Sequence, residues 1–120
     1  HAKFAWPIGE RLVARAMAKK DAEMLNSLAW TIVDPSVEIA DRNLELARKA
    51  ASKAVELTGE KEPNVLDTMA RVHAWQGDFA KAVALQKKAV ALLGDVDDEV
   101  KAGFGKALEE YETKAKAGGK

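Results

Sequence analysis

Apolar side chains recur every third or fourth residue along most of this chain, which is the spacing of one face of an α-helix. The clearest example is 66–93, where Leu66, Met69 and Ala70 precede Gly77 and a second apolar face follows it. Nowhere do apolar and polar residues alternate with the period of two that indicates a β-strand. The pattern therefore predicts an all-α fold of about six helices, over residues 8–19, 22–33, 42–58, 63–76, 79–93 and 98–115.

Residues with strong positional preferences mark the ends of these helices. Aspartate caps a helix because its carboxylate accepts hydrogen bonds from the first free backbone amides. Three aspartates are predicted to act in this way: Asp21, Asp41 and Asp78. Pro63 fits the first turn of its helix, and Asp34-Pro35 ends the second helix because the residue before proline is driven out of the α region. The glycines expected to terminate helices are Gly59, Gly77 and Gly94.

The central part of the chain repeats itself. Segments 25–32 and 66–73 carry apolar or small residues at the same spacing and lie 41 residues apart. Segments 47–54 and 82–89 match in the same way but lie 35 residues apart. The six-residue difference falls in the loop that contains Asp34-Pro35-Ser36. The sequence thus predicts two helical hairpins, of which the first has an enlarged turn.

At these residues the chain resembles the tetratricopeptide repeat family. The turn Gln76-Gly77-Asp78-Phe79, followed by Lys81-Ala82-Val83, is similar to that family's hairpin turn. The small residues that match the family's tight helix contacts are Ala70, Ala82 and Ala89. The resemblance covers about residues 22–94. It implies repeat one over about 22–58, repeat two over about 63–93, and a capping helix over about 98–115 within a single domain, 1–120.

The chain also departs from the family's pattern at several positions. Leucines stand at positions 25 and 66, where the family often has tryptophan, and His73 and Gln86 replace aromatic residues of the second repeat. More loosely, Leu25-Asn26-x2-Ala29-Trp30 is similar to the repeats found behind bacterial thioredoxin-like domains. Since the chain starts at His1 without methionine, we expect an excised domain or a processed fragment, such as the C-terminal repeat region of a larger thioredoxin-like protein.

The two flanking helices carry their own apolar faces. The predicted face of helix 8–19 consists of Ile8, Leu12, Val13, Ala16 and Met17. The predicted face of helix 98–115 consists of Val100, Phe104, Ala107, Leu108 and Tyr111. The acidic pair Glu109-Glu110 is expected on the solvated side of that last helix.

Six residues are predicted to form a partner-binding surface on the first helices of the two hairpins. At about 100° per residue, they face away from each hairpin's own core, and the family resemblance implies that peptides bind in a concave groove on that side. The predicted groove residues are Asn26, Trp30, Asn64, Asp67, Arg71 and Trp75. Two alternatives remain open. Trp30 could be covered by the N-terminal helix through Leu12 or Met17, and Trp75 could simply be exposed at a helix end.

Composition narrows the function classes. With 19 basic and 19 acidic residues, the formal net charge is zero, and nothing recruits nucleic acid or an anionic membrane electrostatically. There is no cysteine, which excludes thiolate chemistry and cysteine-ligated metals. No apolar run approaches the roughly 18 residues of a membrane-spanning helix. A soluble protein of the cytoplasm or periplasm is expected, and the composition does not distinguish these two compartments.

No catalytic, cofactor-binding or metal-binding residue is predicted. His73 shares a helix face with Leu66 and Met69, so a packed, hydrogen-bonded core histidine is favoured over a metal ligand. The family's grip on a partner's C-terminal carboxylate is not expected either, because Asp67 would repel it. The leading hypothesis is a protein–protein interaction scaffold that binds a peptide or helix. The alternatives are a structural appendage that forms a homodimer or positions a fused enzyme domain, and an enzyme in its own right.

Overall fold

The computed structural model of this protein describes residues 6–39 and 41–118. Over these ranges most residues are helical, and no strand is present in them. The helices are α1 (Trp6–Ala18), α2 (Ala22–Val33), α3 (Leu44–Thr58), α4 (Pro63–Trp75), α5 (Phe79–Leu92) and α6 (Asp98–Ala117). The predicted all-α class with six helices is confirmed.

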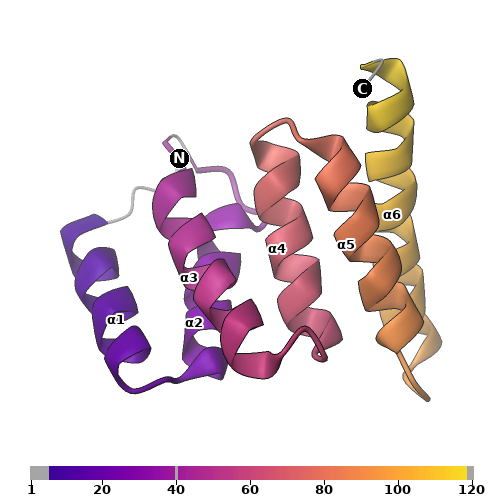
Figure 1. Ribbon diagram of the computed structural model, residues 1–120. Helices are drawn as coiled ribbons and strands as arrows, with labels where there is room; N and C mark the ends of the chain where they lie inside the picture. Colours follow the sequence, from indigo (N-terminus) through magenta and orange to yellow (C-terminus); the bar gives the residue numbers. More distant parts are fainter. Residues whose placement is uncertain (1–5, 40, 119–120) are drawn as a thin grey trace.

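The helices form two layers of roughly antiparallel neighbours (Figure 1). Each helix packs against the next one in the chain, α1 also packs against α3, and α2 also packs against α4. In the view of Figure 1, α2 lies behind α3 and α6 lies behind α5. The two central hairpins, α2–α3 and α4–α5, are therefore stacked side by side, with α1 and α6 at the two ends of the row.

Side-chain caps fix three of the helix starts. Asp21 and Asp78 each accept a hydrogen bond from the backbone amide three residues further on, as the sequence predicts. For α3 the predicted cap, Asp41, is wrong. Its place is taken by Asn43, whose Oδ1 accepts a hydrogen bond from the amide of Leu46 at 3.1 Å. The helix starts later than expected because the preceding residues belong to the loop that joins α2 to α3.

Two of the three expected glycines end their helices in the left-handed conformation. Gly59 has a φ of 64° and caps α3, and Gly77 has a φ of 82° in the turn between α4 and α5. A residue with a Cβ would be strained at either position. Gly94 acts differently, because Leu93, the residue after α5, is already extended and Gly94 itself does not adopt a positive φ.

Small side chains dominate the contact between the helices. Ala47, Ala50, Ala51 and Ala54 of α3 are fully buried, which lets α3 approach α2 and α4 closely. The alanines expected at close contacts of the second hairpin, Ala70, Ala82 and Ala89, are also fully buried. The apolar pattern thus locates the core of both hairpins.

The N-terminal helix uses only part of its predicted apolar face. Val13 and Ala16 are buried, and Met17 packs against the same core. Ile8 is 52% exposed and Leu12 is 43% exposed, contrary to prediction. The reason is positional: α1 ends the row and has helices on one side only, so the outer part of its stripe has no neighbour among the described residues.

Candidate functional site

A hollow of about 240 Å³ lies between α2 and α4, on the layer that these two helices share. Its walls come from corresponding positions of the two hairpins. The lining residues are Asn26, Ser27 and Trp30 of α2, with Asn64, Asp67 and Thr68 of α4. Four of the six predicted groove residues therefore line one hollow, which we call the α2–α4 hollow. Whether a partner occupies it stays a prediction.

The repeat explains why these side chains converge. Asn26 of α2 and Asp67 of α4 occupy equivalent positions of the two hairpins, and the two helices pack directly against each other. Residues at the same position of two stacked repeats must point to the same side of the stack. The spacing of three or four residues then brings Trp30 and Asn64 to the same face as this pair.

The α2 wall of the hollow combines an aromatic ring with an unpaired amide. Trp30 is half-buried and packs against the core cluster that α1, α2, α3 and α4 form, while also lining the hollow. Whether the N-terminal helix covers Trp30 through Leu12 or Met17 stays a prediction. Asn26 is half-buried as well, and its Oδ1 is enclosed without any hydrogen-bond donor among the described residues.

The α4 wall contains the hollow's charged residue, Asp67. Its Oδ1 accepts a hydrogen bond from Gln86 Nε2 at 2.9 Å, and the same amide nitrogen donates to the carbonyl oxygen of Phe104 at 3.2 Å. Burial raises the pKa of Asp67, while the Gln86 hydrogen bond and the nearby charge of Arg71 act in the opposite direction. Asp67 forms no ion pair with another described residue.

Arg71 does not line the hollow, although the sequence placed it in the groove. It is 9% exposed, and its Nη1 lies 3.0 Å from Oε2 of Glu110 on α6. Its guanidinium also stacks over the ring of Tyr111, 4.9 Å from the centroid. Helix α6 thus covers this end of the α4 face, and Glu110, expected on the solvated side of α6, pairs with Arg71.

A polar cluster therefore lies where α4, α5 and α6 meet. Gln86 and Tyr111 are fully buried, and burial raises the pKa of the Tyr111 phenol far above its ordinary range. Three enclosed atoms of the cluster have no hydrogen-bond partner among the described residues: Arg71 Nε, Gln86 Oε1 and Tyr111 Oη. Sequence reasoning missed this cluster. The one available signal was that Gln86 replaces an apolar or aromatic residue on the inner face of its helix.

Trp75 lies away from the hollow and joins the two hairpins. The side chain is 42% exposed, and its Nε1 donates to the carbonyl oxygen of Val33, the last residue of α2, at 2.7 Å. The guanidinium of Arg42 stacks on the same ring, 4.1 Å from the centroid. Trp75 therefore lies outside the lining of the α2–α4 hollow, and its hydrogen bond holds the end of α2 against α4.

Arg42 organises the enlarged loop that the repeat offset predicts. Its Nη1 donates to the carbonyl oxygens of Ile32 at 2.6 Å and Asp34 at 3.2 Å, and its Nη2 donates to that of Val37 at 2.7 Å. A helix end leaves carbonyls without partners, and a guanidinium can satisfy several of them at once. We call Arg42 and Trp75 the inter-hairpin clasp.

His73 only partly fits the prediction of a packed, hydrogen-bonded core histidine. The side chain is half-buried, and no described residue forms a hydrogen bond with it. Burial lowers its pKa below the ordinary value of 6.5, with a smaller opposing effect from Asp78. Among the residues that the structure describes, no group of three or more His, Cys, Asp or Glu side chains could hold a metal ion.

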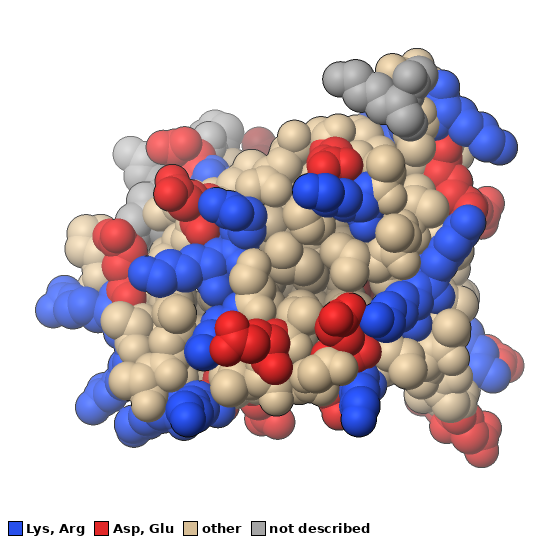
Figure 2. All heavy atoms as spheres, in the orientation of Figure 1, with Lys and Arg blue, Asp and Glu red and all other residues tan. Residues whose placement is uncertain are grey.

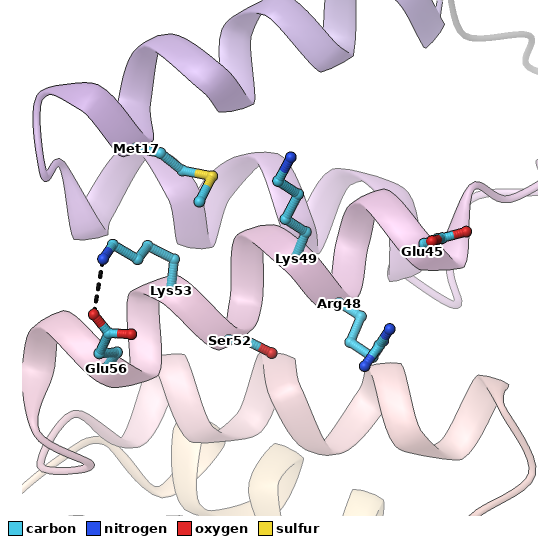
Figure 3. Close-up of a pocket in the computed structure, with 7 residues that line it drawn as sticks. All are labelled: Met17, Glu45, Arg48, Lys49, Ser52, Lys53 and Glu56. Atoms are coloured by element: carbon cyan, nitrogen blue, oxygen red, sulfur yellow. Dashed lines mark hydrogen bonds and ion pairs between the residues drawn. The ribbon is translucent and has the colours of Figure 1, made fainter.

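A second hollow, of about 390 Å³, lies between α1 and α3 (Figure 3). Met17 comes from α1 and the other lining residues come from α3: Glu45, Arg48, Lys49, Ser52, Lys53 and Glu56. In Figure 3 the Lys53 side chain reaches Glu56, and the two form an ion pair of 2.7 Å. Apart from Lys53, these α3 residues are exposed. This hollow therefore offers solvated charges of both signs rather than a fixed site.

The formal net charge of the chain is zero. On the face drawn in Figure 2, both basic and acidic side chains are present, and they lie around a largely uncharged centre. Within the described residues, no helix is both long enough and apolar enough to cross a membrane. Of the two hollows, the α2–α4 hollow is the one that predicted groove residues line, and we take it as the candidate site.

Comparisons of the chain with protein-family models, with curated proteins and with solved structures gave no match.

Proposed function

We propose that this domain is a tetratricopeptide-like protein-interaction module that binds a segment of a partner protein along the face shared by α2 and α4. The single observation that carries the proposal is the α2–α4 hollow, where equivalent positions of two stacked hairpins converge. A half-buried tryptophan beside polar groups is a composition typical of recognition surfaces. The resemblance of 22–94 to the tetratricopeptide repeats supports a binding site on the same side of the molecule.

The module would recognise its partner without catalysing a reaction. The polar groups at the hollow are amides, hydroxyls and one carboxylate, and these suit hydrogen bonding to a peptide. Trp30 would supply the apolar contact area, because its ring already packs against the core cluster of α1 to α4 and loses little freedom on binding.

The test is a selection of twelve-residue peptides from a displayed random library against the 120-residue chain. We expect selected peptides to shift backbone amide signals of α2 and α4 in NMR spectra, and to bind at least tenfold more weakly to Trp30→Ala. Asn64→Tyr, which places a bulky ring at an exposed position of the hollow, should block binding without disturbing the core. Leu92→Ala, an exposed apolar position on α5, is the control. Peptides that bind all four proteins equally would refute the proposal.

A second candidate function is self-association through α1, which would make the domain a dimerising or positioning appendage for a fused enzyme. The observation in its favour is the exposed pair Ile8 and Leu12, one turn apart on the outer side of the helix row. Sedimentation equilibrium of the chain and of Leu12→Glu tests it. A dimer that the charged variant abolishes supports this function, and a monomeric wild-type chain rules it out.

A further inference from the structure

The chemistry of the α2–α4 hollow points to one kind of partner group. Asp67 is the charged residue of the lining, and every other polar side chain there is an amide, a hydroxyl or the indole of Trp30. An ionised carboxylate can accept about four hydrogen bonds, whereas Asp67 receives one, from Gln86 Nε2. Its capacity as an acceptor is therefore largely unused by the described residues.

A second acceptor, in the α2 wall of the hollow, is also unused. Asn26 Oδ1 is enclosed and has no donor among the described residues. Enclosed polar atoms are almost always hydrogen-bonded in proteins, so an exception calls for an explanation. The last side-chain torsion of an asparagine has a broad distribution, so we expect this oxygen to turn toward a donor that enters the hollow.

The positive charge nearest to Asp67 is engaged elsewhere. Arg71 influences the Asp67 carboxylate electrostatically, but its guanidinium is paired with Glu110 and stacked on Tyr111. No lysine or arginine lines the hollow. A carboxylate, two carboxamides and an aromatic face without a resident cation form an environment that complements a positive group.

The size of the hollow limits what can enter. Sites for whole small molecules begin at roughly 300 Å³, and the α2–α4 hollow measures about 240 Å³. A single side chain fits this volume better than a complete cofactor or a second helix. Exposed positions such as Asn64 and Ser27 lie at its rim, where the rest of an extended peptide could pass.

We propose that the α2–α4 hollow binds a lysine or arginine side chain of the partner, with Asp67 as its counter-charge and Trp30 and Asn26 completing the pocket. This inference rests on the proposed peptide-binding function and assigns it a specificity. The proposed charge preference is the opposite of the one expected for a groove of lysines and asparagines, which would bind a partner's carboxylate. Binding of the cation should weaken as salt is added, since part of the attraction is electrostatic.

The test uses three acetylated and amidated peptides of the sequence Gly-Ser-Gly-X-Gly-Ser-Gly, where X is lysine, norleucine or glutamate. The indole N–H signal of Trp30, assigned with Trp30→Phe, reports entry into the hollow, and that of Trp75 serves as an internal reference. We expect the lysine peptide to shift the Trp30 signal saturably and the glutamate peptide to leave it unchanged. Norleucine, which keeps the stem without the charge, should bind at least tenfold more weakly than lysine.

The matched variants are Asp67→Asn and Glu109→Gln. Both remove one negative charge. The first keeps a side-chain oxygen that can accept the hydrogen bond from Gln86, whereas Glu109 is exposed on α6, outside the lining of the hollow. Losing a charge-assisted hydrogen bond typically weakens binding by about tenfold or more. Asp67→Asn should show this loss for the lysine peptide, and Glu109→Gln should bind like the wild type.

Failure of this inference can be told from failure of the proposed function. If library-selected peptides bind at α2 and α4 but contain no recurring basic residue, or if the norleucine and glutamate peptides bind as well as lysine, the cation specificity is refuted while peptide binding stands. If no peptide shifts any signal of α2 or α4, both are refuted. The three-peptide comparison uses the wild-type chain alone, so it remains decisive even if Asp67→Asn folds poorly.

Discussion

The two central hairpins share one architecture but differ in what fills them. The inner side of α3 in the first hairpin is built from leucine and alanine, with Ala51 fully buried. At the position of the second hairpin that corresponds to Ala51 stands Gln86, also fully buried, which bonds to Asp67 and to α6. Thr68 and Arg71 add further buried polar groups to α4.

The difference shows that the same spacing of inward-facing residues can build either an apolar interior or a partly polar one. An apolar interior holds helices together with little dependence on exact partners, whereas a buried polar group must find its own partner or lose stability. The first hairpin thus serves as scaffold. The second hairpin carries hydrogen bonds that fix how α4, α5 and α6 fit together, and it sets the charge of the hollow next to α2.

The largest effect is expected when the first hairpin receives the buried polar residue of the second, glutamine in place of Ala51. In Ala51→Gln a larger side chain would enter a fully packed site and its amide would lack partners. Overpacking costs about 1–3 kcal/mol and an unpaired buried polar group about 1–3 kcal/mol, so we expect a loss of roughly 2–6 kcal/mol in urea unfolding followed by circular dichroism. Lys49→Gln, exposed on the same helix, is the control. A loss in Ala51→Gln below about 1 kcal/mol would contradict the distinction between the two interiors.

A smaller effect is expected from opening the inter-hairpin clasp. Arg42→Ala removes three hydrogen bonds to carbonyl oxygens and the stacking on Trp75. Because the site is only partly buried, water can replace some of these contacts, and we expect a loss of about 2 kcal/mol. Arg48→Ala, an exposed arginine on α3, is the control and should change stability by less than about 0.5 kcal/mol. Equal melting temperatures for the two variants would show that the clasp is dispensable.

The smallest effect concerns pH, through His73 of the second hairpin. Because burial lowers its pKa in the folded state, the unfolded chain takes up a proton first as the pH falls. Neutral His73 therefore makes its full contribution to the free energy of unfolding above the pKa of the unfolded chain, about 6.5. This contribution declines as the pH falls below that value.

The measurement compares wild type with His73→Asn by urea unfolding at pH 7.5 and pH 5.5. The difference between the two proteins should shrink toward the lower pH by less than about 1 kcal/mol, since the side chain is only half-buried and its interactions are screened. His1 is present in both proteins, so its titration cancels. An unchanged difference would mean that His73 has the same pKa in the folded and unfolded chains.

The sequence predicts the helices well because their determinants are local. Capping by Asp21 and Asp78 depends on residues three positions away, and the apolar stripes depend on spacing alone. The prediction that Asp41 caps α3 was wrong because contacts of the preceding loop fix where this helix starts. Arg42 reaches back to carbonyls eight and ten residues earlier, which keeps 41–42 out of the helix and leaves Asn43 to cap it.

Part of the candidate site was also predictable, because the positions of its residues follow from the sequence spacing. Aligning the two hairpins is enough to bring Asn26 and Asp67 to one face, because stacked repeats present equivalent positions together. It cannot reveal that α6 covers Arg71, since the pairing with Glu110 joins residues 39 positions apart on a helix that lies outside the repeat. Nor can it reveal that Trp75 turns toward Val33, which depends on the enlarged loop of the other hairpin.

The inter-hairpin clasp has a consequence for how the domain would respond to a break in its chain. The loop between α2 and α3 is held at its helical end by Arg42 and, through Trp75, by the neighbouring hairpin. A proteolytic cut near the exposed Ser36 would therefore leave α1–α2 attached to the rest of the domain by contacts with both α3 and α4. We expect the nicked protein to remain associated and the separated fragments to reconstitute the fold when mixed. In this domain the integrity of the repeat stack depends on the fit between hairpins more than on the continuity of the backbone.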